Sequence, residues 1–214
     1  MQSSVAITVF NSTLAGDVEG LQSVFNNEGI SGEESPDMFG ETDDVGRNAL
    51  FFACMLGRSC IIQELVKNGG QVNSITARGY TPLHCAAMWG QLDTLKTLVE
   101  LNANLQAVNF RGERAADVAI RYSKLDCAEY LAWIEAKQSL QACIGHFKDA
   151  LTDPGKIQGK LTKDEKNICT NALSAKSDWL QSVKNPTAED FSEQRKQLVD
   201  LVAPILERLN PLCE

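Results

Sequence analysis

The sequence lacks any long hydrophobic run. The longest unbroken apolar stretch is the eight residues from Ala49 to Leu56, whereas a helix needs roughly 20 such residues to cross a bilayer. The first sixteen residues hold no Lys or Arg and one short apolar stretch, Val5 to Phe10, so a secretory signal is not expected. We expect no membrane insertion and a location in the cytosol or nucleus, where the sequon at Asn11 would go unused.

Basic residues are scarce and unclustered. Residues 1–136 hold 9 Lys and Arg against 17 Asp and Glu, whereas residues 137–214 hold 11 of each, so the net charge of -8 arises entirely in the first part. The stretch from Glu28 to Asp44 contains seven acidic residues and no basic one. Because binding to phosphate backbones depends on clustered Lys and Arg, no nucleic-acid partner is predicted.

Paired cysteines and histidines are lacking as well. The two histidines, His84 and His146, lie far apart in the sequence, and no two of the seven cysteines are separated by only two residues. This spacing favours neither a disulfide framework nor a zinc site. We expect free, mostly buried thiols, no metal and no cofactor.

No group of residues indicates catalysis. His84 is the one candidate base, but a base needs a nucleophile within reach, and none is evident in the sequence. The segment Asn68-Gly69-Gly70 could suggest a phosphate loop, yet no Lys-Ser/Thr pair follows it, so it is better interpreted as a helix C-cap. His146, beside apolar Phe147, is interpreted as a packing residue. An enzyme is therefore not predicted.

The sequence does contain an internal repeat. Gly46, Gly79 and Gly112 follow one another at steps of 33 residues. The same step links four further sets of residues, which are Leu50 and Leu83; Ala53, Ala86 and Ala119; Gly57 and Gly90; and Leu65, Leu98 and Leu131. A fixed period of this length is typical of helical units that cannot bury their apolar faces alone and therefore stack.

The central unit runs Arg78-Gly79-Tyr80-Thr81-Pro82-Leu83-His84-Cys85-Ala86-Ala87-Met88-Trp89-Gly90, and it closely resembles the ankyrin repeat with its T-P-L-H signature. Glycine permits the tight turn, and proline opens a helix where its missing N–H costs nothing. The residues predicted to be structural are Gly46, Gly79, Pro82, Leu83, His84, Gly90 and Gly112. The resemblance implies that His84 hydrogen-bonds neighbouring turns. It also implies an all-α ankyrin-repeat solenoid that binds proteins.

The flanking units depart from this pattern, as terminal repeats commonly do. Asn48-Ala49-Leu50-Phe51 replaces T-P-L-H in the unit before, and Ser123 replaces the helix-ending glycine in the unit after. The predicted organisation is a degenerate capping repeat at 1–27, an acidic mobile insertion at 28–43, three ankyrin-type repeats at 44–136 and an antiparallel helical bundle at 137–214.

The last eighty residues show a different helical pattern. Leu140, Cys143, Ile144, Phe147 and Leu151 share one helix face. The sequence Thr162-Lys163-Asp164-Glu165 is a capping box that opens a second helix, with apolar residues Ile168, Ala172, Trp179 and Leu180. Thr187 caps a third, whose apolar positions are Phe191, Leu198, Leu201, Val202, Ile205 and Leu209.

Four motifs in this part resemble, in order and spacing, the helical lid of the seventy-kilodalton heat-shock chaperones. They are Gly159-Lys160-Leu161-Thr162, Ser177-Asp178-Trp179-Leu180, Ala188-Glu189-Asp190-Phe191 and Ala203-Pro204-Ile205. The likeness covers residues 138–209, without the ATPase and peptide-holding domains of that family. It implies a co-chaperone-like element and a chaperone-related client as an alternative to a simple adaptor.

The expected recognition surface combines turn tips with the ends of the first helices, as in other repeat stacks. Carried over from the family pattern, the predicted contact residues are Arg47, Met55, Arg78, Tyr80, Met88, Trp89, Phe110, Arg111, Arg121 and Tyr122. Trp, Tyr and Arg dominate binding hot spots. The alternative is that Met88 and Trp89 are core residues. The leading prediction is an adaptor that binds a protein partner whose identity the sequence does not name.

Overall fold

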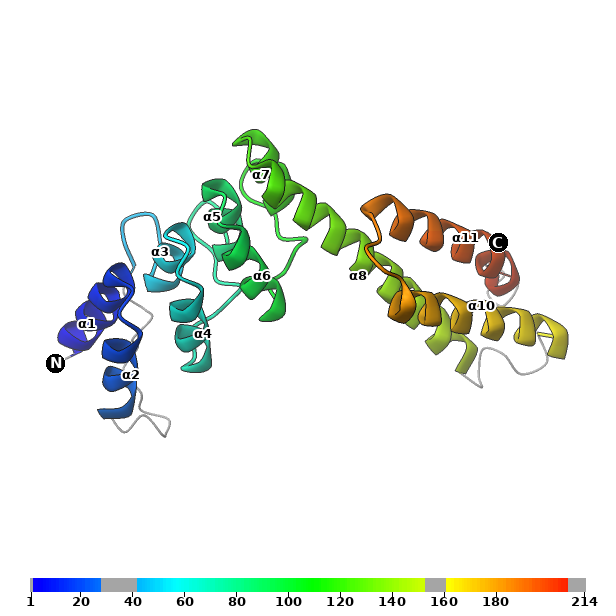
Figure 1. Cartoon of the computed structure of the whole chain (residues 1–214), viewed down its shortest axis with the longest axis horizontal. Coiled ribbons are helices and arrows are strands. Elements are labelled where there is room, and N and C mark those ends of the chain that lie inside the picture. The colour runs from blue at the N-terminus through cyan, green and yellow to red at the C-terminus, as the bar shows by residue number, and fades with distance from the viewer. Residues whose placement is uncertain (1, 28–41, 153–160, 208–214) are drawn as a thin grey trace, which may run out of the picture. The chain divides into compact units, whose positions relative to one another are not determined.

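In the computed structural model, residues 2–27, 42–152 and 161–207 are described, and all the regular elements among them are α-helices (Figure 1). This confirms the predicted all-α fold class. The chain forms two compact units, residues 1–131 and 132–214, here named the repeat unit and the C-terminal unit. Of the predicted acidic insertion, only residues 42 and 43 fall within the described residues. No described helix is both long and apolar enough to cross a membrane.

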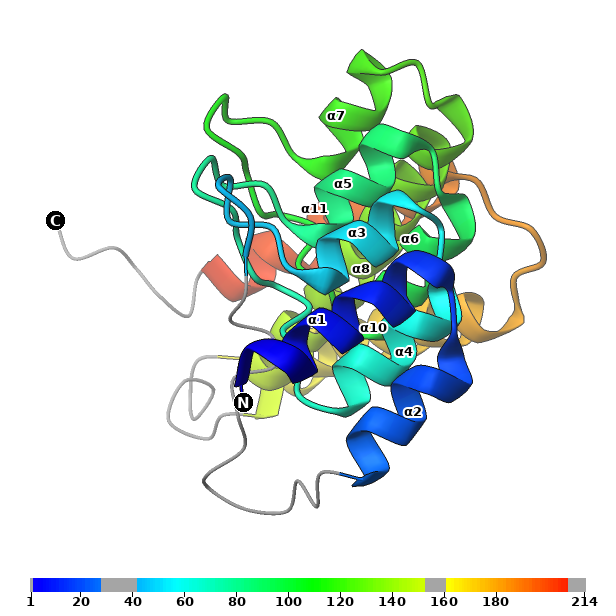
Figure 2. The same cartoon turned by 90° about the vertical axis from the view of Figure 1, so that its left-hand side faces the viewer.

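The repeat unit is built from successive helix pairs. The helices are α1 (Gln2–Ala15), α2 (Val18–Asn27), α3 (Ala49–Met55), α4 (Ser59–Lys67), α5 (Pro82–Trp89), α6 (Leu92–Glu100), α7 (Ala115–Arg121) and the start of α8 (Leu125–Thr152). The first helices α1, α3, α5 and α7 contact one another in that order, and the second helices α2, α4 and α6 do the same (Figure 2). The pairs therefore stack in two layers.

The 33-residue step identifies the core of this stack. Ala53, Ala86 and Ala119 are each fully buried in the first-helix layer. Because alanine is small, neighbouring first helices can approach closely there. Leu65, Leu98 and Leu131 are fully buried at equivalent positions of the second helices.

Side chains of each repeat also cover the helix end of the repeat before it. The side-chain amide of Gln91 donates to the carbonyl oxygen of Met55 at 3.1 Å, and a Cβ added to Gly57 would lie 2.5 Å from the Gln91 Oε1. One repeat later, the Lys124 side chain lies against Gly90 in the same way. Glycine at these helix ends leaves room for the next repeat.

The central helix α5 begins as the sequence predicts. Pro82 occupies its first turn, and Thr81 is its N-cap, with the Thr81 Oγ1 accepting from the His84 N–H at 3.3 Å. The helix ends at Gly90, whose φ of 73° is in the left-handed region. Leu83 is 1% exposed and belongs to the core.

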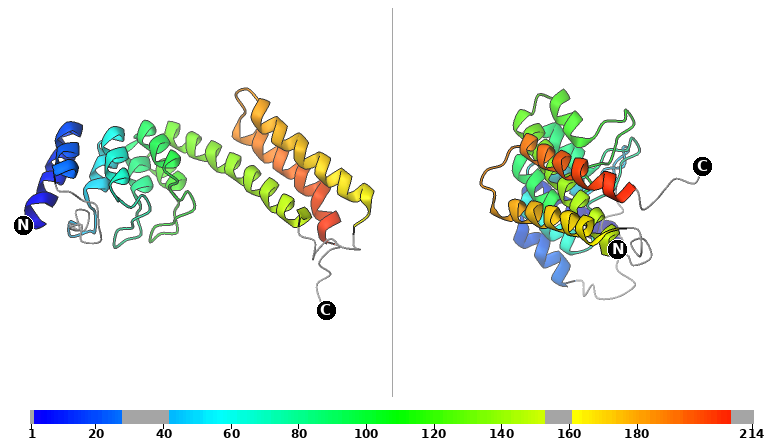
Figure 3. Two further views of the ribbon diagram at one scale, coloured as in Figure 1. Left: turned by 90° about the horizontal axis from the view of Figure 1, so that it is seen from below. Right: turned by 90° about the vertical axis from the view of Figure 1, so that its right-hand side faces the viewer.

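The C-terminal unit consists of the remainder of α8, α10 (Lys163–Ser182) and α11 (Ala188–Glu207), which Figure 3 shows side by side. Its buried core combines Leu140, Ile144, Phe147, Leu151, Cys169, Leu173, Phe191, Leu198 and Val202. The Phe191 ring lies edge-on to both Trp133 and Trp179, with ring centroids 5.6 Å apart in each pair. The Trp133 indole also donates to the Pro186 carbonyl at 2.8 Å, so the buried edge of this ring has a partner.

Two details differ from the sequence interpretation, and a third lies outside the described residues. The pattern beginning at Leu140 is not a separate helix, because α8 runs without a break from Leu125 to Thr152. Ile168 and Leu201 were assigned to the apolar faces of their helices, but they are 46% and 47% exposed. Part of the first lid-like motif, Gly159-Lys160, lies outside the described residues.

Candidate protein-binding surface

Three turns precede the first helices α3, α5 and α7, at residues 43–47, 76–80 and 109–113; we call them tips. In each tip, the N–H of the first residue donates to the carbonyl of the fifth at 2.9 to 3.0 Å, and the glycine N–H donates to the carbonyl of the first at 2.9 Å. A side-chain oxygen of the first residue, Asp43, Thr76 or Asn109, accepts from the N–H of the fifth. These three residues also follow at steps of 33, a signal that the sequence analysis missed.

Neighbouring tips are joined through their backbones. The Ala77 N–H donates to the Val45 carbonyl at 3.1 Å, and the Phe110 N–H donates to the Arg78 carbonyl at 3.0 Å. Figure 3 shows the tips projecting on the same side of the helix pairs. The three tips therefore form one continuous row, and side chains that they carry are held at fixed spacing from repeat to repeat.

His84 connects the central repeat to the last tip. It is 1% exposed, its Nδ1 accepts from the Thr81 N–H at 3.1 Å, and its Nε2 lies 3.0 Å from the Glu113 carbonyl oxygen. Burial lowers the pKa of His84, which favours the neutral ring with Nε2–H as donor to Glu113. This is the contact to a neighbouring turn that the ankyrin resemblance implies.

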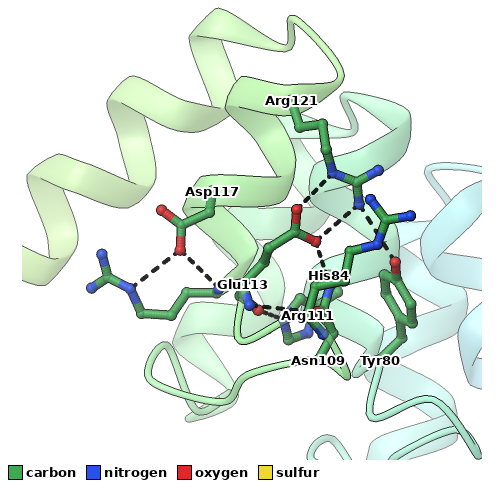
Figure 4. Close-up of polar contacts among 8 residues, drawn as sticks. Tyr80, His84, Asn109, Arg111, Glu113, Asp117 and Arg121 are labelled. Atoms are coloured by element: carbon green, nitrogen blue, oxygen red, sulfur yellow. Dashed lines mark hydrogen bonds and ion pairs between the residues drawn. The ribbon is translucent and has the colours of Figure 1, made fainter.

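Glu113 is the centre of a polar network at the last tip (Figure 4). Its carboxylate accepts from the Asn109 side-chain amide at 2.8 Å and pairs with the Arg121 Nε at 2.8 Å. Arg121 also donates to the Tyr80 hydroxyl at 3.5 Å. The Asn109 hydrogen bond, with the charges of Arg121 and Arg111, holds the pKa of Glu113 below its usual value, so this carboxylate remains ionised at neutral pH.

An exposed aromatic ring lies beside this network. Phe110 is 57% exposed, and the guanidinium carbons of Arg78 and Arg111 lie 5.7 and 5.3 Å from its ring centroid. The Tyr80 ring is 6.2 Å away between centroids. We call Arg78, Tyr80, Phe110, Arg111, Glu113 and Arg121 the tip cluster. Five of the ten predicted contact residues thus belong to the tip cluster.

A second set of exposed residues lies at the C-terminal ends of the first helices. Leu56, Trp89 and Tyr122, each 33 residues from the next, are 46%, 53% and 43% exposed; we call them the helix-end row. The row meets the tip cluster where the Arg121 guanidinium lies 4.6 Å from the Tyr122 ring centroid. With this exposure Trp89 is not a core residue, whereas Met88 is half-buried.

The remaining predicted contact residues lie elsewhere on the repeats. The guanidinium of Arg47 pairs with Asp43 at 2.6 Å and stacks over the Phe52 ring at 5.1 Å. Met55 is half-buried at the end of α3. Among the described residues, no three His, Cys, Asp or Glu side chains gather as metal ligands.

Comparison with known proteins places these repeats in a family. A family model described as ankyrin repeats, in three copies, matches residues 15–109. Ankyrin repeat domain-containing protein 45 of Danio rerio is 58% identical over 212 residues, which cover 98% of this chain and 95% of that protein. The chain belongs to the family of this ankyrin-repeat protein.

Mammalian relatives of the same name extend the likeness. The protein of Homo sapiens is 46% identical over 202 residues, covering 94% of this chain and 76% of that protein. The protein of Mus musculus is 47% identical over 199 residues, covering 92% and 80%. Because these matches span both units, the family includes the C-terminal unit as well as the repeats.

Proposed function

We propose that this chain is an intracellular adaptor that binds another protein through the face formed by its tips and first helices. Ankyrin repeats are a protein-interaction module, which supports a protein partner. The observation that carries the proposal is the helix-end row, in which three consecutive repeats expose a large apolar side chain at the same position. A solenoid presents such repeated positions as one extended binding surface.

The chemistry of this face suits a protein partner. Exposed apolar side chains that gather into a patch commonly mark an interaction site, and here Trp89 and Tyr122 belong to residue types that dominate binding energy. Arginine stacked on an aromatic ring, as in Arg121 on Tyr122, is another common interface feature. The buried His84, with both ring nitrogens engaged in structural hydrogen bonds, offers no comparable support for an enzyme.

The test compares affinity capture by the wild-type chain and by Trp89→Ala, with the captured proteins identified by mass spectrometry. Since Trp89 is 53% exposed, its replacement should leave thermal stability nearly unchanged while partner capture is lost. A loss of about 3 to 5 kcal/mol, as for a core aromatic, would contradict a binding role. Leu83→Ala is the stability control, because truncating this buried leucine should cost about 2 to 5 kcal/mol.

A co-chaperone-like role of the C-terminal unit is the second candidate. Besides the lid-like motifs, an open groove of about 750 Å³ between α8 and α10 supports it. Ile144, Leu151 and Leu173 form apolar parts of its lining, and Lys148 and Lys166 are among its polar residues. An apolar floor with a charged rim is suited to a short segment of unfolded or helical polypeptide.

This candidate is tested by filling the groove. Ser174 lines it and is exposed, so Ser174→Arg should obstruct the groove without disturbing the core. If the second role is correct, the full chain captures a heat-shock protein or an unfolded client, and Ser174→Arg loses that protein while Trp89→Ala retains it. If the wild-type chain captures neither a heat-shock protein nor an unfolded client, the co-chaperone hypothesis is wrong.

A further inference from the structure

The tip cluster carries more positive than negative charge. The cluster holds three guanidinium groups and one carboxylate: Arg121 pairs with Glu113 at 2.8 Å, and Arg78 and Arg111 lie against the Phe110 ring. Arg78 and Arg111 form no ion pair with any described residue. The cluster therefore presents two uncompensated positive charges on a chain whose net charge is -8.

The positions of these two arginines are fixed although their side chains are exposed. Both guanidinium groups lie near the Phe110 ring, at 5.7 and 5.3 Å from its centroid. Each arginine precedes the glycine of its tip, and the hydrogen bond from the Phe110 N–H to the Arg78 carbonyl links the two tips. Contact with the ring restricts the flexible side chains, so less conformational entropy is lost when a ligand binds.

The hydrogen-bonding state of the last tip decides which anion fits. Compact phosphate groups favour a concave set of free backbone N–H groups. Here the N–H groups of Phe110, Arg111, Gly112 and Glu113 all donate within the protein, to Arg78 or Asn109 oxygens. Anion recognition must therefore come from guanidinium groups carried by two successive tips, an arrangement that matches carboxylates spaced along an extended peptide.

We propose that the tip cluster binds an acidic peptide segment of the partner protein, with carboxylates pairing with Arg78 and Arg111 and an apolar side chain packing on Phe110. This inference rests on the proposed adaptor function and adds the chemistry of the partner. It also explains why these exposed positions carry arginine in a part of the chain that is otherwise acidic: the two charges select a partner of opposite sign and speed its association.

The test measures fluorescence polarisation of a labelled Glu-Glu-Leu-Glu-Glu-Leu peptide with the full-length protein. Arg78→Gln combined with Arg111→Gln should weaken binding at least about tenfold, which corresponds to about 1.4 kcal/mol, because two arginine–carboxylate contacts are lost. The matched control, Lys67→Gln combined with Lys96→Gln, removes the same charge from the second helices α4 and α6 and should change affinity less than about twofold. Thermal unfolding should be unaltered in both variants, which excludes misfolding as the cause.

Charge reversal provides a second arm. Arg78→Glu combined with Arg111→Glu should bind a Lys-Lys-Leu-Lys-Lys-Leu peptide in place of the acidic one. Four results would each overturn the inference. The wild-type protein could fail to bind the acidic peptide, or could bind a peptide with Gln for Glu equally well. The control pair could weaken binding as much as the arginine pair, or the protein could bind only a phosphoserine-containing peptide. In affinity capture, partners lost with Trp89→Ala but kept with the Arg78 and Arg111 double variant would leave the adaptor function standing without its acidic partner. Partners kept by both variants would contradict the adaptor function itself.

Discussion

The contacts between neighbouring tips predict that alanine will destabilise the protein more at Gly79 than at Gly112. Gly79 and Gly112 occupy the same position in consecutive tips and have almost the same backbone conformation, with φ of 72° and 73°. Their surroundings differ. A Cβ on Gly79 would lie 3.3 Å from two backbone atoms at the start of the next tip, the Asn109 Cα and the carbonyl oxygen of the preceding Val108. A Cβ on Gly112 would meet nothing within 4 Å.

The expected free-energy losses follow from this difference. Alanine in the left-handed region costs about 1 to 2 kcal/mol, and the smaller entropy of the unfolded chain offsets about 0.4 to 1 kcal/mol of that. Gly112→Ala should therefore destabilise the protein by about 1 kcal/mol. Gly79→Ala carries the same cost plus a crowding cost of about 1 to 3 kcal/mol, because the crowded atoms belong to the backbone and cannot rotate away.

Urea unfolding of the full chain, followed by far-ultraviolet circular dichroism, measures both losses. Both variants retain the same C-terminal unit, so the difference between them reports on the repeat unit. Gly46→Ala serves as a replicate, since its Cβ would lie 3.3 Å from the Ala77 backbone nitrogen of the neighbouring tip; it should behave like Gly79→Ala. Equal losses at Gly79 and Gly112 would refute the idea that tip-to-tip packing couples the repeats.

Two further predictions concern single hydrogen-bonded side chains. Burial lowers the pKa of His84 from its usual 6.5. Below pH 6.5 the unfolded chain therefore binds a proton more readily than the folded chain, so the stability of the protein should fall as the pH drops. Urea midpoints measured from pH 7 to 5 should fall less steeply for His84→Gln than for the wild type. The Thr187 Oγ1 accepts from the Asp190 N–H at 3.1 Å at the start of α11, so Thr187→Ala should cost about 1 kcal/mol. Thr170→Ala, at an exposed position within α10, is its control; a comparable loss of stability there in chemical denaturation would contradict the capping role.

The 33-residue step predicted much of the repeat unit because it reflects geometry that recurs in every unit. A turn with positive φ needs glycine at Gly46, Gly79 and Gly112, and close first helices need small residues at Ala53 and Ala86. Both constraints act on residue type directly, so they are visible in one sequence. The same holds for the capping box at Thr162, whose hydroxyl accepts from the Glu165 N–H at 3.2 Å.

Other features were missed because residue type alone does not reveal them. Asn109 is one of many polar turn residues in the sequence, and only its spacing of 33 from Thr76 could have marked it. Its role becomes clear when its side chain is seen holding the N–H groups of Arg111 and Glu113 within the same tip. The unbroken α8 was missed for a different reason. The residues from Ala132 to Ser139 include neither Gly nor Pro, and a change in apolar pattern was interpreted as a helix boundary although no residue there would end a helix.

The central repeat holds both of its neighbours, and this explains why they can be degenerate. Toward the unit before, the Ala77 N–H reaches Val45 and the Gln91 side chain reaches Met55. Toward the unit after, His84 lies within hydrogen-bonding distance of the Glu113 carbonyl. The flanking units therefore need not carry the full signature themselves, since their turns and helix ends are positioned by groups of the central unit. Glu113 connects the buried and exposed parts of this tip, because its carbonyl contacts buried His84 while its carboxylate pairs with Arg121. The unit that matches the ankyrin signature most fully thus orients the tip to which we assign partner recognition.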